Sequence, residues 1–220
     1  MAYHGIDPIL FKLRPGETVL VEYESVSSPE LLFYLLCRRC MARDVPVLVD
    51  DISDTFPEYV VRLELMGLPV EDLLNVPVIK IGGSREFGNV LGRVEVDKYS
   101  LDFRYYGEIY ERIVPEKVVC NPVLGIYKLF VALERHEVIR LVRNISTFVG
   151  RKSRFALYFI NRDVIERRTP EILPLLEETA STVLHWEAGK GKYRLKAVKA
   201  ANDEVLGEVA SLSFRDIRGV

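Results

Sequence analysis

The chain has 220 residues, of which 49% are hydrophobic and 28% are charged, and its formal net charge is −2. This length suffices for one large α/β domain, and three cysteines are too few for a disulfide-stabilised scaffold. No apolar run reaches the roughly 18 residues that a membrane-spanning helix needs, and the first residues lack the pattern of a secretory signal. We therefore expect a cytoplasmic protein without a membrane partner.

The charges are unevenly distributed along the chain. Residues 1–60 carry ten acidic and five basic residues, whereas residues 117–220 carry twelve acidic and eighteen basic residues. A basic half can attract an anionic partner, but opposite charges are interleaved there, which favours an ordinary salt-bridged surface. Glutamine is absent and the charged fraction is high, a composition typical of heat-stable proteins, so we expect a thermophilic source.

Residues 18–41 predict a strand, a serine-containing turn and a helix, around which the other elements are arranged. The apolar run at 18–24 indicates a buried strand. Ser28 suits the N-cap and Pro29 the first helical position, and leucines follow at helical spacing. The first N–H groups of such a helix often bind a phosphate, but this turn has no glycine to approach a phosphate closely and no lysine to balance its charge.

Strands and helices alternate along most of the remaining chain. Residues 1–17 indicate a lead-in segment with one short helical turn. Strands are expected at residues 46–50, 78–81, 89–96, 118–120 and 155–161. Helices are expected at residues 55–66, 101–114, 126–149 and 162–179. We expect the third helix to break near residues 134–137, and prolines at 170 and 174 to kink or split the fourth.

The C-terminal part has a different pattern. Residues 182–186, 192–199, 205–209 and 212–214 predict strands, and the gaps between them are too short for helices, which indicates a β-meander over residues 181–217. The whole chain, residues 1–220, is therefore predicted to form a single domain of the α/β class. We expect a three-layer α/β/α arrangement with a mostly parallel central sheet and antiparallel C-terminal edge strands.

The cysteines do not indicate a metal site. Cys37 and Cys40 form a CxxC pair, but zinc needs four ligands and the sequence has no second pair to supply them. A redox CxxC normally lies at the start of a helix, whereas this pair lies two or three turns into one. We expect packed, free cysteines, with a disulfide to Cys120 as the alternative.

The order of these elements resembles the RecA-like core of the KaiC family of ATPases. The likeness covers residues 18–214 and rests on four stretches: the first strand at 18–21, the helix and Gly-Leu-Pro-Val turn at 60–70, the strand end at 118–121, and the strand, helix and strand at 155–187. It implies a RecA-like fold. In that family a phosphate loop follows the first strand, and an aspartate near residue 121 would help to hold Mg²⁺.

The residues that carry this family's chemistry are different here. When GxxxxGK[ST] is aligned with residues 23–30, Tyr23 and Ser28 replace the glycines, Pro29 replaces the lysine and Glu30 replaces the Mg²⁺-binding hydroxyl. Asn121 replaces the aspartate and lacks its charge. The resemblance therefore implies a domain with lost Walker A and Walker B motifs, without a cofactor or a metal. A narrower resemblance to uncharacterised proteins of hyperthermophilic archaea implies no established function.

A ligand crevice is expected where the carboxyl ends of the parallel strands meet. The polar residues placed there are Ser25, Ser27, Ser28, Asp50, Asp51, Asn121 and Asn161. They form a polar rim, but they do not include a recognisable set of catalytic residues, so we assign no catalytic residue. The glycine-containing loop at 82–88 can present N–H groups to an anion, but no helix follows it, which favours a plain turn.

Basic residues form a second candidate site. Lys192, Arg194 and Lys196 alternate along one predicted strand and so share one side of it. A phosphate-binding face would combine them with Arg151, Lys152 and Arg154. The alternative is a solvated outer face of an edge strand, where charge also discourages edge-to-edge pairing.

Three functions are compatible with these patterns. The first is a non-catalytic RecA/KaiC-like module with a regulatory or protein-binding role, including self-association. The second is a nucleic-acid-binding protein that uses the basic C-terminal half. The third is a small-ligand-binding protein or enzyme that uses the crevice, with Asp50 and Asp51 as acid–base or metal-binding groups. The missing ATPase motifs favour the first function.

Overall fold

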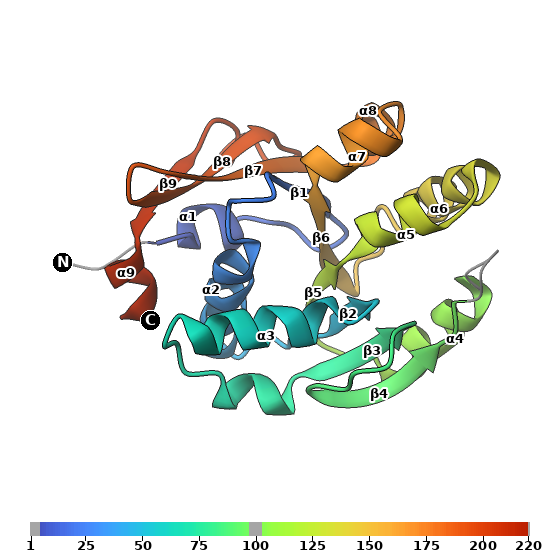
Figure 1. Ribbon diagram of the computed structural model, residues 1–220, viewed down its shortest axis with the longest axis horizontal. Helices are drawn as coiled ribbons and strands as arrows, with labels where there is room; N and C mark the ends of the chain where they lie inside the picture. Colours follow the sequence, from blue (N-terminus) through green and yellow to red (C-terminus); the bar gives the residue numbers. More distant parts are fainter. Residues whose placement is uncertain (1–4, 97–102, 220) are drawn as a thin grey trace.

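The computed structural model describes residues 5–96 and 103–219 and is built on one nine-stranded sheet (Figure 1). The strand order is β4-β3-β2-β5-β6-β1-β7-β8-β9. The strands are β1 (Thr18–Tyr23), β2 (Val49–Ile52), β3 (Pro77–Ile81), β4 (Asn89–Val94), β5 (Val119–Leu124), β6 (Arg154–Asn161), β7 (Thr182–Gly189), β8 (Lys192–Lys199) and β9 (Val209–Ser213). The pairs from β4 across to β7 are parallel, and β8 and β9 are added antiparallel. The expected α/β fold, with antiparallel C-terminal strands, is confirmed.

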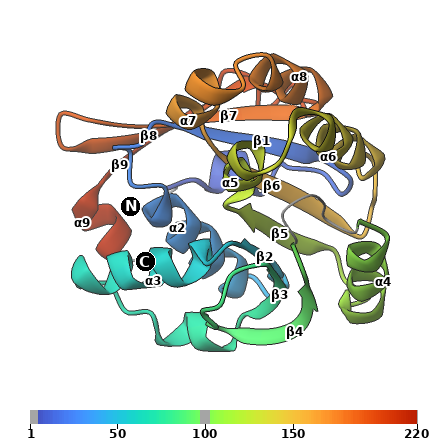
Figure 2. The same cartoon turned by 45° about the vertical axis from the view of Figure 1, so that its right-hand side comes forward.

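Helices cover both faces of the sheet (Figures 1 and 2). One face packs against α1 (Asp7–Leu10), α2 (Pro29–Met41), α3 (Thr55–Leu65), the 3₁₀ helix η1 (Glu71–Asn75) and α9 (Phe214–Arg218). The other packs against α4 (Phe103–Ile113), α5 (Ile126–Ala132), α6 (Arg135–Thr147), α7 (Arg162–Arg168) and α8 (Ile172–Thr179). Each face has its own hydrophobic core, which gives the three layers that were expected.

Strand β1 lies inside the sheet between β6 and β7, and all six of its residues are buried. Alternate residues serve opposite cores: Val19 and Val21 pack on the α2 side and Leu20 on the opposite side. This period of two is what a pleated strand buried on both faces requires. It also places Tyr23 and Glu22, the last two residues of the strand, on opposite faces.

Most element boundaries follow the sequence pattern. The break in the third helix falls between α5 and α6, and residues 169–171 separate α7 from α8 near Pro170. The helix begins as expected, with Ser28 at the N-cap and Pro29 at the first position, although the Ser28 side chain makes no capping hydrogen bond and its backbone is left-handed with φ of 49°. The strand expected at 205–209 was wrong, because residues 203–207 turn before β9 begins at Val209. The short helix α9 was not anticipated.

Residues 82–88 connect two adjacent parallel strands, β3 and β4, without a helix. Such connections normally need a dozen or more residues. Here the loop runs back over the α3 side, where the ring of Phe87 lies 5.2 Å from that of Phe56. The three cysteines are buried and free, as expected. In the described part of the chain, no helix combines the length and apolar character needed to cross a bilayer.

Candidate functional site

Two backbone groups of the turn that follows β1 are bound by the protein's own side chains. The Ser25 N–H donates to the Asp163 carboxylate at 2.8 Å, and the Trp186 indole N–H donates to the carbonyl of Ser27 at 2.7 Å. The Ser25 hydroxyl lies 3.2 Å from the amide oxygen of Asn161. The hydrogen bond from the Ser25 N–H lowers the pKa of Asp163, because it stabilises the ionised carboxylate.

Three tyrosines fill the space beside the turn, on the α2 side of the sheet. The Tyr23 ring meets the Tyr127 ring edge to face at 6.4 Å, and the hydroxyls of Tyr23 and Tyr59 are 3.5 Å apart. Burial raises the pKa of each of these phenols, so all three stay neutral. The end of β1 therefore abuts a packed, uncharged aromatic group.

The loop after β3, for which a plain turn was expected, presents N–H groups to a carboxylate of the chain itself. The N–H groups of Ser84 and Arg85 donate to Asp54 at 3.0 and 2.9 Å. Lys80, buried at 2% exposure, bridges Asp54 and Asp51. Burial disfavours the charge on Asp54, but the bonds from Lys80 and the two N–H groups outweigh this effect and lower its pKa to about 2.

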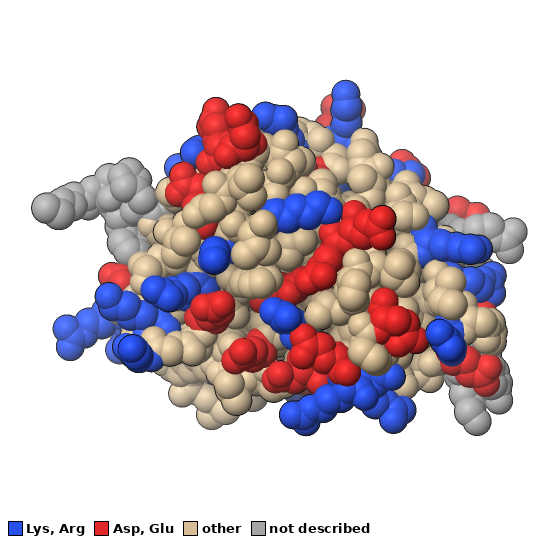
Figure 3. Space-filling model, turned by 90° about the horizontal axis from the view of Figure 1, so that it is seen from above, with Lys and Arg blue, Asp and Glu red and all other residues tan. Residues whose placement is uncertain are grey.

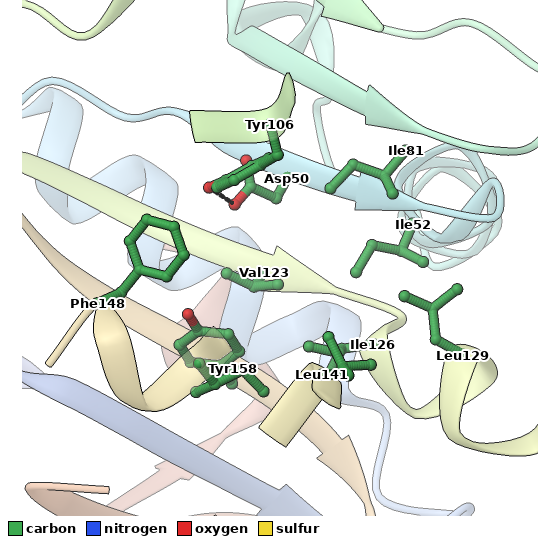
Figure 4. Close-up of a pocket in the computed structure, with 11 residues that line it drawn as sticks. Asp50, Ile52, Ile81, Tyr106, Val123, Ile126, Leu129, Leu141, Phe148 and Tyr158 are labelled. Carbon is green, nitrogen blue, oxygen red and sulfur yellow. Dashed lines mark hydrogen bonds between the residues drawn. The ribbon is translucent and has the colours of Figure 1, made fainter. Parts of the chain in front are cut away.

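Asp50 points to the opposite side of β2, into a cavity of about 40 Å³ between the sheet and α4, α5 and α6 (Figure 4). One carboxylate oxygen, Oδ2, accepts a hydrogen bond from the Tyr106 hydroxyl at 2.7 Å. The other oxygen, Oδ1, is buried and has no partner. Burial raises the pKa of Asp50 to about 6, although the nearby Arg154 charge and the hydrogen-bonding side chains of Tyr106 and Asn121 oppose the shift.

Arg154 lies behind Tyr106 in the protein interior, at 2% exposure. Its guanidinium donates to the hydroxyl of Tyr106 at 2.9 Å and to the side-chain oxygen of Asn121. It also lies between two aromatic rings, 4.9 Å from that of Tyr110 and 4.7 Å from that of Phe148. The expectation that Arg154 joins an exposed basic face was wrong, because β6 begins at this residue and directs it into the core.

A further charged group lies at the carboxyl end of β1, on the α8 side. Glu22 is 1% exposed, and its register partner on β7, His185, places Nε2 3.2 Å from Oε2. Arg162 Nε is 3.5 Å from the same oxygen. Burial, and then the Glu22 charge, raise the pKa of Glu177, which approaches Glu22 from α8. Two carboxyl groups therefore share this site with one imidazole and one guanidinium.

The other candidate basic residues do lie toward the surface. Lys192, Arg194 and Lys196 project from β8, and Lys152 is exposed after α6, whereas Arg151 is half-buried and paired with Glu111. On the side uppermost in Figure 1, Lys and Arg are interspersed with Asp and Glu (Figure 3). In the described residues the three β8 cations have no ion-pair or hydrogen-bond partner, unlike most other arginines and lysines.

The structure divides the residues of the expected crevice between two places. Ser25, Ser27, Ser28 and Asn161 lie at or beside the turn, and Asp51 lies with Lys80 on the same side of the sheet. Asp50 and Asn121 lie instead in the core beneath α4, hydrogen-bonded to Tyr106 and Arg154. The cause is the pleat, which sends Asp50 and Asp51 to opposite faces.

Sequence reasoning missed several residues that determine these contacts: Glu22, Lys80, Tyr106, Asp163, Glu177 and Trp186. A signal existed for two of them, because Glu22 and Lys80 are charged residues inside otherwise apolar strands, and a buried charge needs a partner. No group of three or more metal-ligating side chains arranged to hold a metal ion occurs among the described residues.

Residues 9–211 match the model of one protein family, which is described as "Pyrococcus protein of unknown function, DUF257". The chain belongs to the DUF257 family. A solved structure with 38% identity to this DUF257 chain is that of PH0250 from Pyrococcus horikoshii OT3, with a TM-score of 0.84. The similarity covers 95% of this chain and 98% of PH0250. A search of curated proteins found no match.

More distant solved structures resemble the DUF257 chain in fold alone. The flagellar accessory protein FlaH from Methanocaldococcus jannaschii is 13% identical with a TM-score of 0.60, over 94% of this chain and 88% of FlaH. A solved ATPase domain is 11% identical with a TM-score of 0.58, over 96% of this chain and 86% of that domain. These neighbours support the RecA-like fold expected from the sequence.

Proposed function

We propose that this protein is a non-catalytic RecA-like domain, with lost Walker A and Walker B motifs, that acts as a regulatory or protein-interaction module. The observation that carries the proposal is the state of the turn after β1. Its Ser25 N–H donates to Asp163 and its Ser27 N–H donates to the carbonyl of Glu24, so these groups already have internal partners where a phosphate loop would offer N–H groups to a ligand.

The charges around this turn also oppose a nucleotide. Glu30, in the first turn of α2, is 2% exposed and has one cation nearby, Arg62 at 3.4 Å. A phosphate at the start of α2 would meet this carboxylate and that of Asp163, and no lysine lies in the first turn of α2. Asn121, at the position of the expected metal ligand, is bonded to Arg154, whose charge would repel Mg²⁺. The residues present therefore do not fit MgATP.

A role in protein–protein interaction is supported by two exposed apolar residues, one in the turn after β1 and one at the end of α3. Val26, at the tip of the turn, is 81% exposed, and Leu65, at the end of α3, is 83% exposed. Isolated exposed apolar side chains are ordinary, so each is weak support by itself. Val26, however, extends from the turn whose backbone is fixed by Asp163 and Trp186, and a rigid apolar tip suits contact with a protein partner or a second copy of the chain.

We expect no binding of ATP with Mg²⁺ in isothermal titration calorimetry, and no phosphate release above the uncatalysed rate. An Asp163→Ala variant is the matched control, because it removes the carboxylate on the Ser25 N–H without adding a lysine or a glycine. This variant should also bind no ATP, since the tyrosines and Glu30 remain. Micromolar binding or measurable turnover by the unmodified protein would contradict the proposal.

A second candidate function is nucleic-acid binding by β8. Lys192, Arg194 and Lys196 project from one side of β8, and no helix covers the outer side of β8 and β9 in Figure 1. The observation that favours this function is that, in the described part of the chain, the three cations form no ion pair that must break before they contact phosphates. Charge-driven binding of this kind depends strongly on salt.

If β8 binds nucleic acid, replacing Lys192, Arg194 and Lys196 together with glutamine should weaken duplex DNA binding in a fluorescence anisotropy assay. The slope of log K against log salt should fall in magnitude by roughly 2 to 3, because three phosphate contacts are lost. The control replaces Lys12, Arg93 and Arg140, which are paired with acidic residues, and changes the net charge equally. Equal effects of the two triple variants, or no binding at low salt, would exclude β8 as the interface.

A further inference from the structure

The C-terminal edge of the sheet lacks the features that usually protect an edge strand. β9 has β8 on one side and no strand on the other, and both lie at the end of the sheet away from α4 and α6 (Figure 2). Its sequence, Val-Ala-Ser-Leu-Ser, contains no charged residue and no proline, which are the residues that discourage pairing with a further strand. The opposite edge strand, β4, has Arg93 and an irregular register at Leu91. β9 is therefore the edge at which another strand can add.

The backbone groups of β9 that face this edge follow from the hydrogen bonds on its other side. In an antiparallel pair, residues bonded to the neighbouring strand alternate with residues whose N–H and C=O groups point away. The Ala197 N–H of β8 donates to the carbonyl of Glu208, just before β9, and the register continues without a shift. By this alternation Ala210 bonds to β8. Val209 and Ser211 then direct their N–H and C=O groups to the free edge.

Three cations lie one strand in from this edge. Lys192, Arg194 and Lys196 project from β8, so the charge that was expected to discourage edge pairing is not on the edge strand itself. Arg194 lies opposite Ser211 of β9, and Lys192 lies opposite Ser213. Two strand spacings, about 10 Å, would separate β8 from a strand added to β9, and an arginine or lysine and a glutamate together span this distance over a serine. Acidic residues on an added strand therefore meet these cations.

The acidic side chains nearest to the cations do not neutralise them. Glu187 is the register partner of Arg194 on β7, yet in the described part of the chain the two form no ion pair. The pKa of Asp216 is lowered mainly by hydrogen bonds from Ser213, and only to a lesser extent by the charge of Lys192. The positive charge of β8 is therefore available to a partner.

The beginning of β9 is apolar. Val209 is 51% exposed, and two more exposed apolar side chains lie beside it, Val198 on β8 and Leu206 in the turn before β9. The turn is held against β8 because the Gly207 N–H donates to the carbonyl of Ala197. The edge therefore has an apolar section at the start of β9 and a cationic section toward its end.

We propose that β9 is the docking edge for an extended segment of a partner protein, which adds antiparallel to β9 as a further strand and carries acidic residues at alternate positions. Its backbone bonds to Val209 and Ser211. Its acidic side chains face Arg194 and Lys192, and an apolar residue follows them opposite Val209. This inference rests on the proposed role as a protein-interaction module. A second copy of the chain fits less well, because antiparallel pairing of two β9 strands places the cations of both copies on one sheet face.

The test is a fluorescence anisotropy titration of the unmodified protein with a labelled peptide, Thr-Glu-Thr-Glu-Thr-Val-Thr. Its two glutamates and its valine alternate with threonines, in the order that the edge requires. A peptide with lysine in place of both glutamates should bind about tenfold more weakly, because two attractive charge pairs become repulsive. Equal binding of the two peptides, or no binding of the glutamate peptide at low salt, would overturn the proposal.

N-methylation of the peptide tests backbone pairing separately from charge. In the antiparallel arrangement the glutamate N–H groups face β9, whereas the N–H groups of the threonines between the charged and apolar residues face away. N-methylation of both glutamates should weaken binding about tenfold, and N-methylation of two of those threonines should have little effect. Equal losses from the two modifications would refute strand addition.

Two variants of β9 give the matching readout within the protein. The Ser211 N–H is not used by β8, so a proline is tolerated there as on other edge strands, but it removes a donor from the free edge. Ser211→Pro should weaken binding of the glutamate peptide about tenfold, with an unchanged far-UV circular dichroism spectrum. Ser211→Thr keeps the N–H and should bind as the unmodified protein does. Equal affinities of the two variants would contradict the proposal.

Duplex DNA is the competing anion in the same assay. Displacement of the glutamate peptide by DNA, together with equal effects of the two N-methylations, would assign the cations to nucleic acid and overturn the proposal. Failure of this inference is distinct from failure of the proposed function. Binding of MgATP would contradict the non-catalytic role, whereas unselective binding of the peptides would contradict only the docking edge.

Discussion

Replacing Arg154 with methionine is expected to lower the free energy of unfolding by about 3–5 kcal/mol. Arg154 is 2% exposed, and its guanidinium donates to Tyr106 and Asn121 between two aromatic rings. Methionine keeps much of the packing but removes the positive charge near Asp50, which is then left buried without compensation. The loss can be measured by guanidinium chloride denaturation at pH 7.5.

The matched control is Arg151→Met, three residues earlier. Arg151 also lies over the rings of Tyr110 and Phe148, but its ion pair is with Glu111, an exposed residue. Partly exposed pairs of this kind contribute at most about 1 kcal/mol. Similar losses for the two variants would show that Arg154 acts through its contacts with the rings and not through its charge.

The effect of Arg154→Met should depend on pH in a defined direction. The pKa of Asp50 in the folded protein, about 6, is above the value of about 3.9 expected for an unfolded chain. The protonated form is therefore favoured by folding, and the stability linked to this group is present below pH 4 and is lost as the pH rises through the folded pKa. Removing Arg154 raises that pKa further, so the deficit should be largest above pH 7 and should shrink toward pH 4.

The sequence pattern predicted the fold well because its strong signals are local. The apolar strand at 18–23, the proline after Ser28 and the break before Arg135 each depend on neighbouring residues, and the structure has the corresponding elements. The predictions of secondary structure were wrong where contacts between residues distant in the sequence determine the backbone conformation. Residues 205–209 have a strand-like composition, but the N–H groups of Val205 and Glu208 donate to the carbonyls of Asn202 and Val205 and close turns there, while the Gly207 N–H donates to Ala197 of β8.

The candidate site was harder to predict, because its residues are brought together by register and pleat. Asp50 and Asp51 are adjacent in sequence and were assigned to one crevice, yet they are bonded to Tyr106 and Lys80 on opposite faces of the sheet. Glu22 meets His185 only because β1 and β7 pair in a register that aligns them. The register between β1 and β7 cannot be predicted from a single sequence. The charge of Glu22 within a buried strand does indicate, however, that this side chain has a partner.

The carboxyl ends of the strands on the α2 side share one physical property. Charged and polar groups there are bound to one another: Lys80 to Asp51 and Asp54, Lys128 to Glu58, and Trp186 to the turn after β1. A ligand that binds at this edge of the sheet would have to break hydrogen bonds and ion pairs within the protein, because these polar groups are already bound to one another. The same edge therefore contributes to folding stability, and Lys80 is the residue on which this contribution can be measured.

Lys80→Met is expected to lower the free energy of unfolding by about 3–5 kcal/mol at pH 7. Lys80 is 2% exposed, and its ammonium group lies 2.7 Å from Oδ2 of Asp51, which is itself 1% exposed. Its second partner is Asp54. Without the lysine, two neighbouring carboxylates remain with no cation, and Asp51 keeps only the N–H of Phe56, at 2.8 Å.

The pH dependence of this variant distinguishes a lost charge from lost packing. In the unmodified protein Asp54 has a pKa of about 2, below the unfolded value of about 3.9, so its stabilising effect is present above pH 4 and is lost as the pH falls through about 2. Lys80→Met removes the part of this effect that Lys80 supplies, while the N–H groups of Ser84 and Arg85 remain, so its deficit should be full at pH 7 and should narrow below pH 4. Lys128→Met, which breaks a half-exposed pair with Glu58, should cost at most about 1 kcal/mol. A deficit for Lys80→Met that is constant down to pH 3 would mean that the methylenes of Lys80, and not its charge, stabilise this edge of the sheet.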